Sequence, residues 1–303
     1  MDFLRLIRYK NLFMVLLTMF LTKYALIDSQ ITTISLSYFN FSLLSVSVLL
    51  IAIGGYLIND VFDINTDVIN KPNKVYVDQI LSFKKAIYLS ILLSLIGFLL
   101  GTYLSIITNS YCLIGVFLFC IFSLFFYSFY LKKRILIGNI LVSILCSSTI
   151  LLTYFFHMRA STYSLFFRTT LYHTILGYVF FAFLTTLIRE IIKDIEDVDG
   201  DIHIKATTLP IVIGRKRTSK VAFFFSCILL VFLFLSILSF RTNYLFFGYG
   251  ILFIMIPFVY FMSKLWFSES KKDFSKLSVL LKIIMLLGII SMLLFKIEVP
   301  IVK

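Results

Sequence analysis

The chain is a series of long apolar segments separated by short polar ones. Nine of these segments have close to the ~20 residues that an α-helix needs to cross the hydrocarbon core of a bilayer. They lack the alternation of apolar and polar positions that marks a membrane-spanning β-strand. Helices are therefore expected, because a backbone in lipid must satisfy its own hydrogen bonds. The expected spans are 11–28, 38–58, 86–107, 111–130, 138–156, 171–192, 219–240, 244–266 and 278–297.

The composition supports a membrane protein. Of 303 residues, 60% are hydrophobic and only 14% are charged, whereas a soluble domain averages about 25% charged residues. Polar stretches long enough to form a separate soluble domain are missing. The sequence predicts an all-α, polytopic membrane protein in which residues 1–303 form one membrane-embedded domain. About nine transmembrane helices are expected to form a bundle around a central cavity.

The charged residues predict how the chain lies in the membrane. Most of the Lys and Arg residues fall before the first span and in every second loop after it, and the formal net charge is +13. By the positive-inside rule, the N-terminus and these loops are expected on the cytoplasmic side of an inner or cytoplasmic membrane. The basic excess is explained by topology and by contact with anionic membrane lipids. No nucleic-acid partner is expected, since no nucleic-acid-binding motif accompanies the charge.

The first group of acids directly follows the second span, in "GGYLINDVFDINTDVINKP" at 54–72. If the helix continues two turns beyond the membrane, Asn59, Asp60, Asp63 and Asp67 share one face, because residues three and four apart are neighbours on a helix. Like charges at this spacing repel one another. A cation among them would remove the repulsion, and oxygen ligands suit Mg²⁺, which commonly shares its coordination with substrate phosphates. The spacing predicts a Mg²⁺ site.

A second group of acids follows the sixth span, in "REIIKDIEDVDGDIHIKATTLPIVIG" at 189–214. Asp194, Asp197 and Asp201 repeat the spacing of three and four, and Gly200 is expected to loosen the helix at this point. An even number of membrane crossings separates the two groups, so both face the same side. Together they are expected to hold Mg²⁺ ions around an anionic ligand such as diphosphate. Basic residues interleaved with the acids are Lys71, Lys74, Arg134, Arg189 and Lys205.

These motifs resemble those of the UbiA superfamily of intramembrane prenyltransferases. The family's NDxxDxxxD motif is matched by residues 59–67, and its DxxxD motif by Asp197 and Asp201, with Asp194 one turn earlier. Nine helices with the N-terminus inside is the family's usual topology, and the resemblance covers essentially the whole chain. Smaller matches are "NKP" at 70–72, "YSFYLKK" at 127–133 and Asn139.

The resemblance implies Mg²⁺-dependent transfer of a polyprenyl group from an allylic prenyl diphosphate to a lipophilic acceptor. The apolar polyprenyl tail is expected to lie between helices, partly among the membrane lipids. The implied catalytic residues and metal ligands are Asn59, Asp60, Asp63 and Asp67 for one Mg²⁺, and Asp194, Asp197 and Asp201 for another. The candidates for contact with the diphosphate are Lys71, Lys133, Arg134, Arg189 and Lys205.

Several functions remain open from the sequence. The stretch from 189 to 214 is most similar to the branch of digeranylgeranylglyceryl phosphate synthase, which implies a glycerol-phosphate ether lipid as acceptor. Relatives that prenylate aromatic quinone precursors share both motifs and are the alternative. A cation- or proton-coupled transporter is a weaker alternative, because its acids would be expected near the bilayer midplane. A CDP-alcohol phosphatidyltransferase would leave the acids at 59–67 unexplained.

Overall fold

The computed structural model of the chain describes residues 2–29, 36–70, 77, 80–158 and 165–298. These residues form helices joined by short turns, with an isolated bridge between Val77 and Leu81. The α-helices are α1 (Asp2–Leu6), α2 (Tyr9–Leu21), α3 (Tyr38–Phe62), α4 (Ile64–Asn70), α5 (Phe83–Ile107), α6 (Cys112–Phe129), α7 (Ile137–Met158), α8 (Leu165–His203), α9 (Leu209–Ile213), α10 (Arg215–Ser239), α11 (Tyr244–Tyr249), α12 (Ile256–Phe267), α13 (Lys271–Ile290) and α14 (Leu294–Glu298). Thr22–Ile27 and Gly250–Met255 are π-helical, and Leu131–Lys133 and Ser291–Leu293 are 3₁₀ turns.

The described residues contain nine helical spans long and apolar enough to cross a membrane, which confirms the predicted number. The protein is therefore an integral membrane protein. The sixth span differs most from its prediction, because its helix continues past residue 192 through the second acidic group to His203. The nine spans are Tyr9–Ile27, Tyr38–Phe62, Phe83–Ile107, Cys112–Phe129, Ile137–Met158, Leu171–His203, Arg215–Ser239, Tyr244–Phe267 and Lys271–Ile297.

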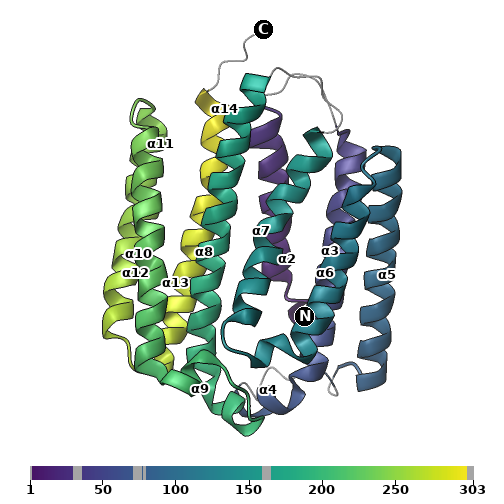
Figure 1. Cartoon of the computed structure of the whole chain (residues 1–303), viewed down its shortest axis with the longest axis vertical. Coiled ribbons are helices and arrows are strands. Elements are labelled where there is room, and N and C mark those ends of the chain that lie inside the picture. Colours follow the sequence, from purple (N-terminus) through teal and green to yellow (C-terminus); the bar gives the residue numbers. More distant parts are fainter. Residues whose placement is uncertain (1, 30–35, 71–76, 78–79, 159–164, 299–303) are drawn as a thin grey trace.

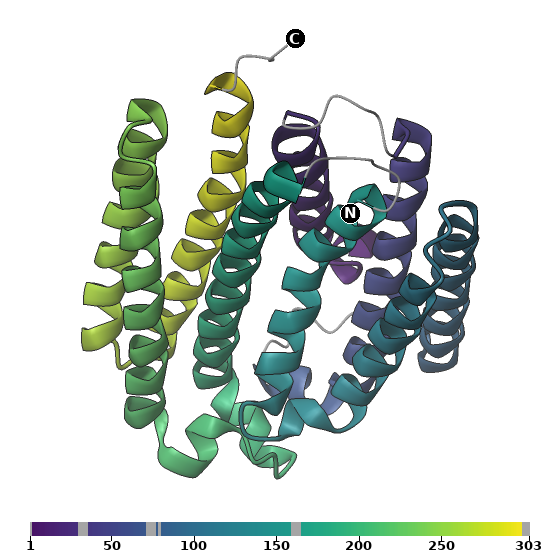
Figure 2. The same cartoon turned by 45° about the horizontal axis from the view of Figure 1, so that its top comes forward.

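The spans form a closed bundle in which each packs against its neighbours in the sequence. Going around the bundle, contacts run from α2 through α3, α5, α6, α7, α8, α10 and α12 to α13, and α13 closes the ring against α2. Figures 1 and 2 show α2, α3, α5, α6 and α7 on one side and α8, α10, α12 and α13 on the other. Contacts of α8 with α13 and of α2 with α7 fill part of the interior.

Small residues allow the closest helix pair, α3 and α5, to approach each other. The Ser90 hydroxyl donates a hydrogen bond to the Gly54 carbonyl at 2.7 Å, and the Ser47 hydroxyl donates to the Gly97 carbonyl at 2.6 Å. In lipid there is little hydrophobic drive between helices, so close packing at small residues and interhelical hydrogen bonds stabilise the pair. This pairing fixes α3, which carries the first acidic group at its end.

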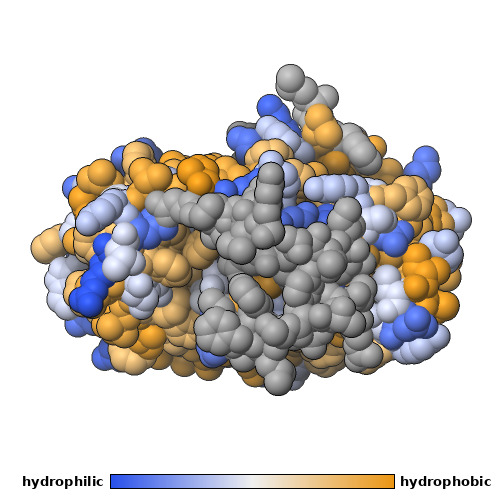
Figure 3. Space-filling view, turned by 90° about the horizontal axis from the view of Figure 1, so that it is seen from above, coloured by the Kyte–Doolittle hydropathy of each residue, from blue (hydrophilic) through white to orange (hydrophobic). Residues whose placement is uncertain are grey.

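The outside of the bundle is apolar. Large hydrophobic side chains are exposed along α5 and α6, among them Tyr88 at 70% and Phe122 at 69%. The end-on view in Figure 3 shows hydrophobic side chains around the flanks. This surface suits contact with lipid tails. At the end of the bundle opposite α14, α4 and α9 lie beside the end of α8 (Figure 1).

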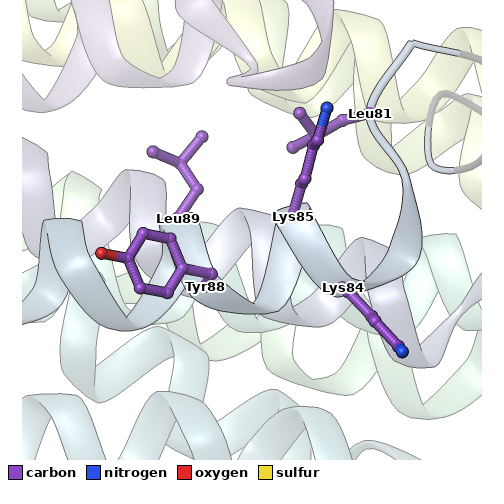
Figure 4. Close-up of a pocket in the computed structure, with 5 residues that line it drawn as sticks. All are labelled: Leu81, Lys84, Lys85, Tyr88 and Leu89. Carbon is purple, nitrogen blue, oxygen red and sulfur yellow. The ribbon is translucent and has the colours of Figure 1, made fainter.

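A pocket of about 360 Å³ lies where α5 begins (Figure 4). It is lined by Leu81, Lys84, Lys85, Tyr88 and Leu89, none of which belongs to the predicted site. The central cavity expected from the sequence stays a prediction.

Candidate active site

The first acidic group lies at a break between two helices. Asp63 caps the C-terminus of α3, where its N–H donates to the Asn59 carbonyl at 2.9 Å, and α4 begins at the next residue. The N–H of Asp67 then donates to the Asp63 carbonyl at 2.8 Å. The predicted uninterrupted helix through all four residues is therefore wrong at Asp63. The turn still keeps the local spacing because Asp63 retains helical backbone angles.

Two cations from distant parts of the chain pair with two carboxylates of this group. The Arg8 guanidinium forms an ion pair with Asp60, and the Lys132 ammonium forms one with Asp63, whose residue is only 6% exposed. Burial disfavours the charged forms of both bases, but the neighbouring carboxylates outweigh it. The pKa of Arg8 is raised mainly by Asp60, and Asp63 raises the pKa of Lys132 above its ordinary value of 10.5. Both bases are therefore fully charged at neutral pH.

Asn59 completes the first group with an amide. Its Nδ2 donates to Asp63 Oδ2 at 2.6 Å, while its Oδ1 is buried without a hydrogen-bond partner among the described residues. An orphaned buried oxygen is costly unless a ligand satisfies it. Oxygen atoms are also the ligands that Mg²⁺ prefers.

The second acidic group lies on one uninterrupted helix, α8. Asp194 accepts a hydrogen bond from Asn139 of α7 at 2.8 Å, and Asp201 is buried. The helix does not loosen at Gly200, as the sequence had suggested, but continues to His203. Gly200 serves a different purpose, because it lets α4 approach α8 closely. A Cβ at this position would lie 2.4 Å from Asn70 Nδ2 and 2.9 Å from the Thr66 carbonyl oxygen.

Asn70 joins the two acidic segments directly. Its Nδ2 donates to the Asp197 carbonyl at 2.8 Å, and its Oδ1 accepts from the Gly200 N–H at 2.9 Å. Lys132 lies within electrostatic reach of Asp194 as well as being paired with Asp63. The two groups, 127 residues apart at the Asn70 contact, therefore lie together at one end of the bundle.

The bases named from the sequence lie in different surroundings. Lys133 is held by its backbone, because its carbonyl accepts from both the N–H and the hydroxyl of Thr207 at 2.9 Å. Arg134 is exposed and stacks on Tyr130, with its guanidinium carbon 4.5 Å from the ring centroid. Lys205 is exposed and has a left-handed backbone (φ 52°). Lys71 lies outside the described residues.

Arg189 faces Glu190 on its own helix. Its Nη1 donates to Glu190 Oε1 at 2.8 Å, and Lys193 shares the same oxygen at 3.3 Å. Arg189 Nε is buried without a hydrogen-bond partner among the described residues.

The sequence did not single out Arg8 or Lys132 as site residues, although Lys132 lies in the matched "YSFYLKK" run. Nothing in a local spacing pattern shows that either base reaches the aspartates.

The donor set fits a hard divalent cation. Among the described residues, no three His, Cys, Asp or Glu side chains lie close enough together to bind a metal as a group. Arg8 and Lys132 are instead paired with two of the carboxylates. The available donors are nonetheless carboxylate and amide oxygens, and the orphaned Asn59 Oδ1 is one of them. This chemistry fits Mg²⁺ and excludes sites built on soft sulfur ligands.

Comparison with known proteins identifies the family. The model of the UbiA prenyltransferase family matches residues 11–288. The chain belongs to the UbiA prenyltransferase family. It is therefore a membrane-embedded prenyltransferase.

Three curated relatives of this UbiA-family chain share a single name. Digeranylgeranylglyceryl phosphate synthase from Methanosphaera stadtmanae is 36% identical over 239 residues, covering 78% of this chain and 80% of that protein. The enzyme of the same name from Saccharolobus solfataricus is 35% identical over 249 residues, covering 81% and 80%. That from Methanococcoides burtonii is 32% identical over 274 residues, covering 89% and 90%.

Solved structures share the fold. A structure described as digeranylgeranylglyceryl phosphate synthase matches with a TM-score of 0.67 and 24% identity, covering 98% of each chain. A UbiA homologue from Archaeoglobus fulgidus, bound to DMAPP and Mg²⁺, matches with a TM-score of 0.62 and 13% identity, covering 96% of this chain and 99% of that one. These matches support the arrangement of the nine spans found among the described residues.

Proposed function

We propose that this UbiA-family enzyme transfers a polyprenyl group from an allylic prenyl diphosphate to a glycerol-phosphate ether lipid. The curated relatives support this acceptor, because all three named above are digeranylgeranylglyceryl phosphate synthases. The homologue bound to DMAPP and Mg²⁺ supports a diphosphate donor and a magnesium cofactor. The observation that carries the proposal is the joining of the two acidic segments through Asn70.

The residues of both acidic groups would hold the cofactor. Asn59, Asp60, Asp63 and Asp67 supply oxygens from α3 and α4, and Asp194, Asp197 and Asp201 supply oxygens from α8. When bound, Mg²⁺ neutralises the negative charge that grows on the departing diphosphate. Lys132, held at Asp63, adds a fixed positive charge in the same place. Preorganised charge of this kind stabilises a transition state without reorganisation.

The transfer breaks one bond and makes another. The C–O bond between the allylic carbon and the diphosphate breaks, and its electron pair leaves with the diphosphate. A hydroxyl oxygen of the acceptor donates an electron pair to the allylic carbon and forms the new ether bond. The hydroxyl proton passes to the released diphosphate. The acid–base balance closes without any oxidant or reductant.

We also propose that the acidic end of the bundle faces the cytoplasm. The basis is the excess of Lys and Arg in the loops at that side of the predicted topology. A reporter fused to the N-terminus should be accessible from the cytoplasm only, and accessibility from the opposite side would contradict the orientation.

The function is tested with labelled geranylgeranyl diphosphate and membranes that contain the protein. A labelled ether lipid is expected from the glycerol-phosphate acceptor. It should disappear with EDTA and return with added Mg²⁺. A labelled aromatic product, formed instead when quinone precursors are offered, would contradict the proposed acceptor.

Two aspartate variants test the site within the same helix. Asp194→Asn should abolish transfer, because Asp194 belongs to the proposed site. Asp199→Asn is the matched control, since Asp199 is exposed between the site residues and pairs with Arg215 at 2.6 Å. Equal loss of activity in both variants would contradict the assignment of the second acidic group.

A further inference from the structure

A second group of basic side chains lies between α2, α8 and α13, which pack against one another. The Lys282 ammonium of α13 donates to Asn11 Oδ1 of α2 at 2.6 Å. Arg189 of α8 and Lys10 of α2 lie close enough to repel the charge on Lys282. The sequence suggested Arg189 as a contact of the diphosphate, but Lys282 and Lys10 belong to neither family motif and to neither acidic group.

The charges around Lys282 do not balance. Arg8 has Asp60 as its partner, and Arg189 and Lys193 share Glu190. Within the described part of the chain, the charged neighbours of Lys282 are both cations, and its hydrogen-bond partner is a neutral amide. Beside it, Arg189 Nε is a buried donor without a partner. The region therefore offers an excess of positive charge and at least one unused donor.

Lys282 and Arg189 lie inside candidate membrane spans, away from the ends of their helices. Lys282 is eleven residues beyond the start of α13 at Lys271, which places it about 16 Å along the helix axis. Arg189 is fourteen residues before the end of α8 at His203, or about 21 Å from that end. Ionisable groups inside a membrane are costly and are normally paired. A structural tether between α2 and α13 would need only neutral side chains, so the charge on Lys282 calls for an anionic partner.

Polar side chains connect this region with the first acidic group. Asn11, the partner of Lys282, faces the Tyr56 hydroxyl of α3. The Arg8 guanidinium lies over the Tyr56 ring at 5.0 Å from its centroid and pairs with Asp60. A ligand bound at Lys282 would therefore lie at one end of a polar path that leads to the proposed magnesium site.

We infer that Lys282 and Arg189 bind the phosphate of the lipid acceptor. This inference rests on the proposed function, since it assigns a site to one of the two substrates. The relatives' name places a phosphate on the glyceryl product, and prenyl transfer adds only hydrocarbon, so the acceptor must already carry that phosphate. A phosphate monoester has a charge of about −1.5 to −2 at neutral pH. It would supply the anion that the region lacks, while the acidic groups and their cations serve the diphosphate of the donor.

The site would also determine acceptor specificity. Binding the phosphate at Lys282 leaves the glycerol hydroxyl free to point along the polar path toward Asp60. An aromatic acceptor without a phosphate would leave Lys282 and Arg189 Nε unsatisfied. Unpaired buried polar groups discriminate strongly against a ligand that lacks the matching group.

The test compares two acceptors in the purified full-length enzyme with Mg²⁺. One is glyceryl phosphate carrying a single geranylgeranyl ether, and the other is the same lipid without the phosphate. Lys282→Met should raise the KM for the phosphorylated acceptor about tenfold to a hundredfold, the range expected for one charge-assisted hydrogen bond. The KM for the prenyl diphosphate and the rate with the dephosphorylated lipid should stay within about twofold of wild type, because no phosphate contact is lost there.

Two further variants serve as controls. Lys282→Arg keeps the charge and should restore most of the acceptor affinity. Lys272→Met removes an exposed positive charge from the same helix and should leave both KM values unchanged. Asn11→Asp gives Lys282 a carboxylate partner and should also raise the acceptor KM. This variant replaces Lys282→Met as the test if Lys282→Met does not fold.

Each outcome supports or overturns the inference. An unchanged acceptor KM in folded Lys282→Met, or in Asn11→Asp if that is the variant that folds, would overturn it. So would a raised donor KM, or an equal loss with both acceptors, which would indicate a structural role. If wild type makes no ether lipid at all, the proposed function fails rather than this site alone.

Discussion

The contact between Gly200 of α8 and Asn70 of α4 is expected to fix the distance between the two acidic groups, and a substitution at Gly200 tests this. In Gly200→Ala, the added methyl would lie 2.4 Å from Asn70 Nδ2, 2.7 Å from its Cγ and 2.9 Å from the Thr66 carbonyl oxygen. The Asn70 side chain can rotate away, but the Thr66 oxygen belongs to the backbone of α4. To reach an ordinary contact of 3.4 Å, α4 must therefore move by about 0.5 Å.

The energetic cost follows from these contacts. Rotating Asn70 away loses its two hydrogen bonds to α8, each worth about 0.5–1.5 kcal/mol. Replacing a helical Gly by Ala recovers about 0.5–1 kcal/mol of backbone entropy. We expect a net decrease in the free energy of unfolding of about 1–2 kcal/mol, with overpacking bringing it toward 3 kcal/mol. Activity should fall more steeply, by about 10- to 100-fold, because small displacements of catalytic groups are costly.

The assay measures both quantities on the same preparations. SDS titration in mixed micelles gives the free energy of unfolding, and labelled prenyl transfer gives kcat/KM. Gly177→Ala is the matched control on the same helix, since its added methyl would meet only Phe232 Cζ, at 3.8 Å. That variant should be as stable and as active as wild type, or slightly more stable.

A double variant distinguishes loss of the Gly200–Asn70 contact from a general destabilisation of α8. In Gly200→Ala with Asn70→Ala, most of the clashing side chain is absent, so the combined loss of stability should be smaller than the sum of the single losses. Full additivity would show that Asn70 and Gly200 do not interact. Wild-type activity in Gly200→Ala would refute the conclusion that α4 must dock closely on α8.

Three further predictions concern the cations of the site. Lys132→Met should lower kcat/KM at least about tenfold by leaving Asp63 without its charged partner. Lys272→Met, which removes an exposed lysine from α13, should change it by less than about twofold, and similar losses in both variants would contradict the pairing. Because Asp63 raises the pKa of Lys132 above 10.5, the ion pair contributes fully below the unfolded-state pKa and is lost only as pH rises through the higher folded-state value. The difference in thermal stability between wild type and Lys132→Met should therefore be constant from about pH 6 to about pH 9, and a difference that decays within this range would refute the assignment. Arg8→Lys should retain part of the activity by keeping a charge near Asp60, and Arg8→Met should lose it, measured as kcat/KM in folded protein; equal activity in the two variants would show that this charge is not needed.

The number of spans was readable from the sequence because each span satisfies its backbone hydrogen bonds locally. Length and apolarity then suffice to find it, and the nine expected segments correspond to the nine spans among the described residues. Helix ends were harder to place. The sixth span was expected to end at 192, yet α8 continues to His203 because its polar last turns pack against α4 and α9.

Gly200 shows why the low helix propensity of glycine led to a wrong prediction of a loosened helix. Glycine costs about 0.5–1 kcal/mol in a helix interior relative to alanine, which favours reading it as a weak point. Here the missing side chain creates the space into which Asn70 fits, and the two resulting hydrogen bonds offset that cost. The partner is 130 residues away, so no window of sequence around Gly200 contains the reason for it.

The acids of the site were visible in the sequence, but the cations that face them were not. Asp60, Asp63 and Asp194 stand out because acids repeat at helical spacing directly after an expected membrane span. Arg8 and Lys132 lie 52 and 69 residues from their partners, among many Lys and Arg residues that topology already explains. The positive-inside rule thus hides such bases in a sequence, since it already predicts Lys and Arg residues in the loops where they occur. The positive-inside rule does not explain Lys282, because this lysine lies within a span and not in a loop. Its charge therefore points to a ligand, whereas the charge of a loop lysine does not.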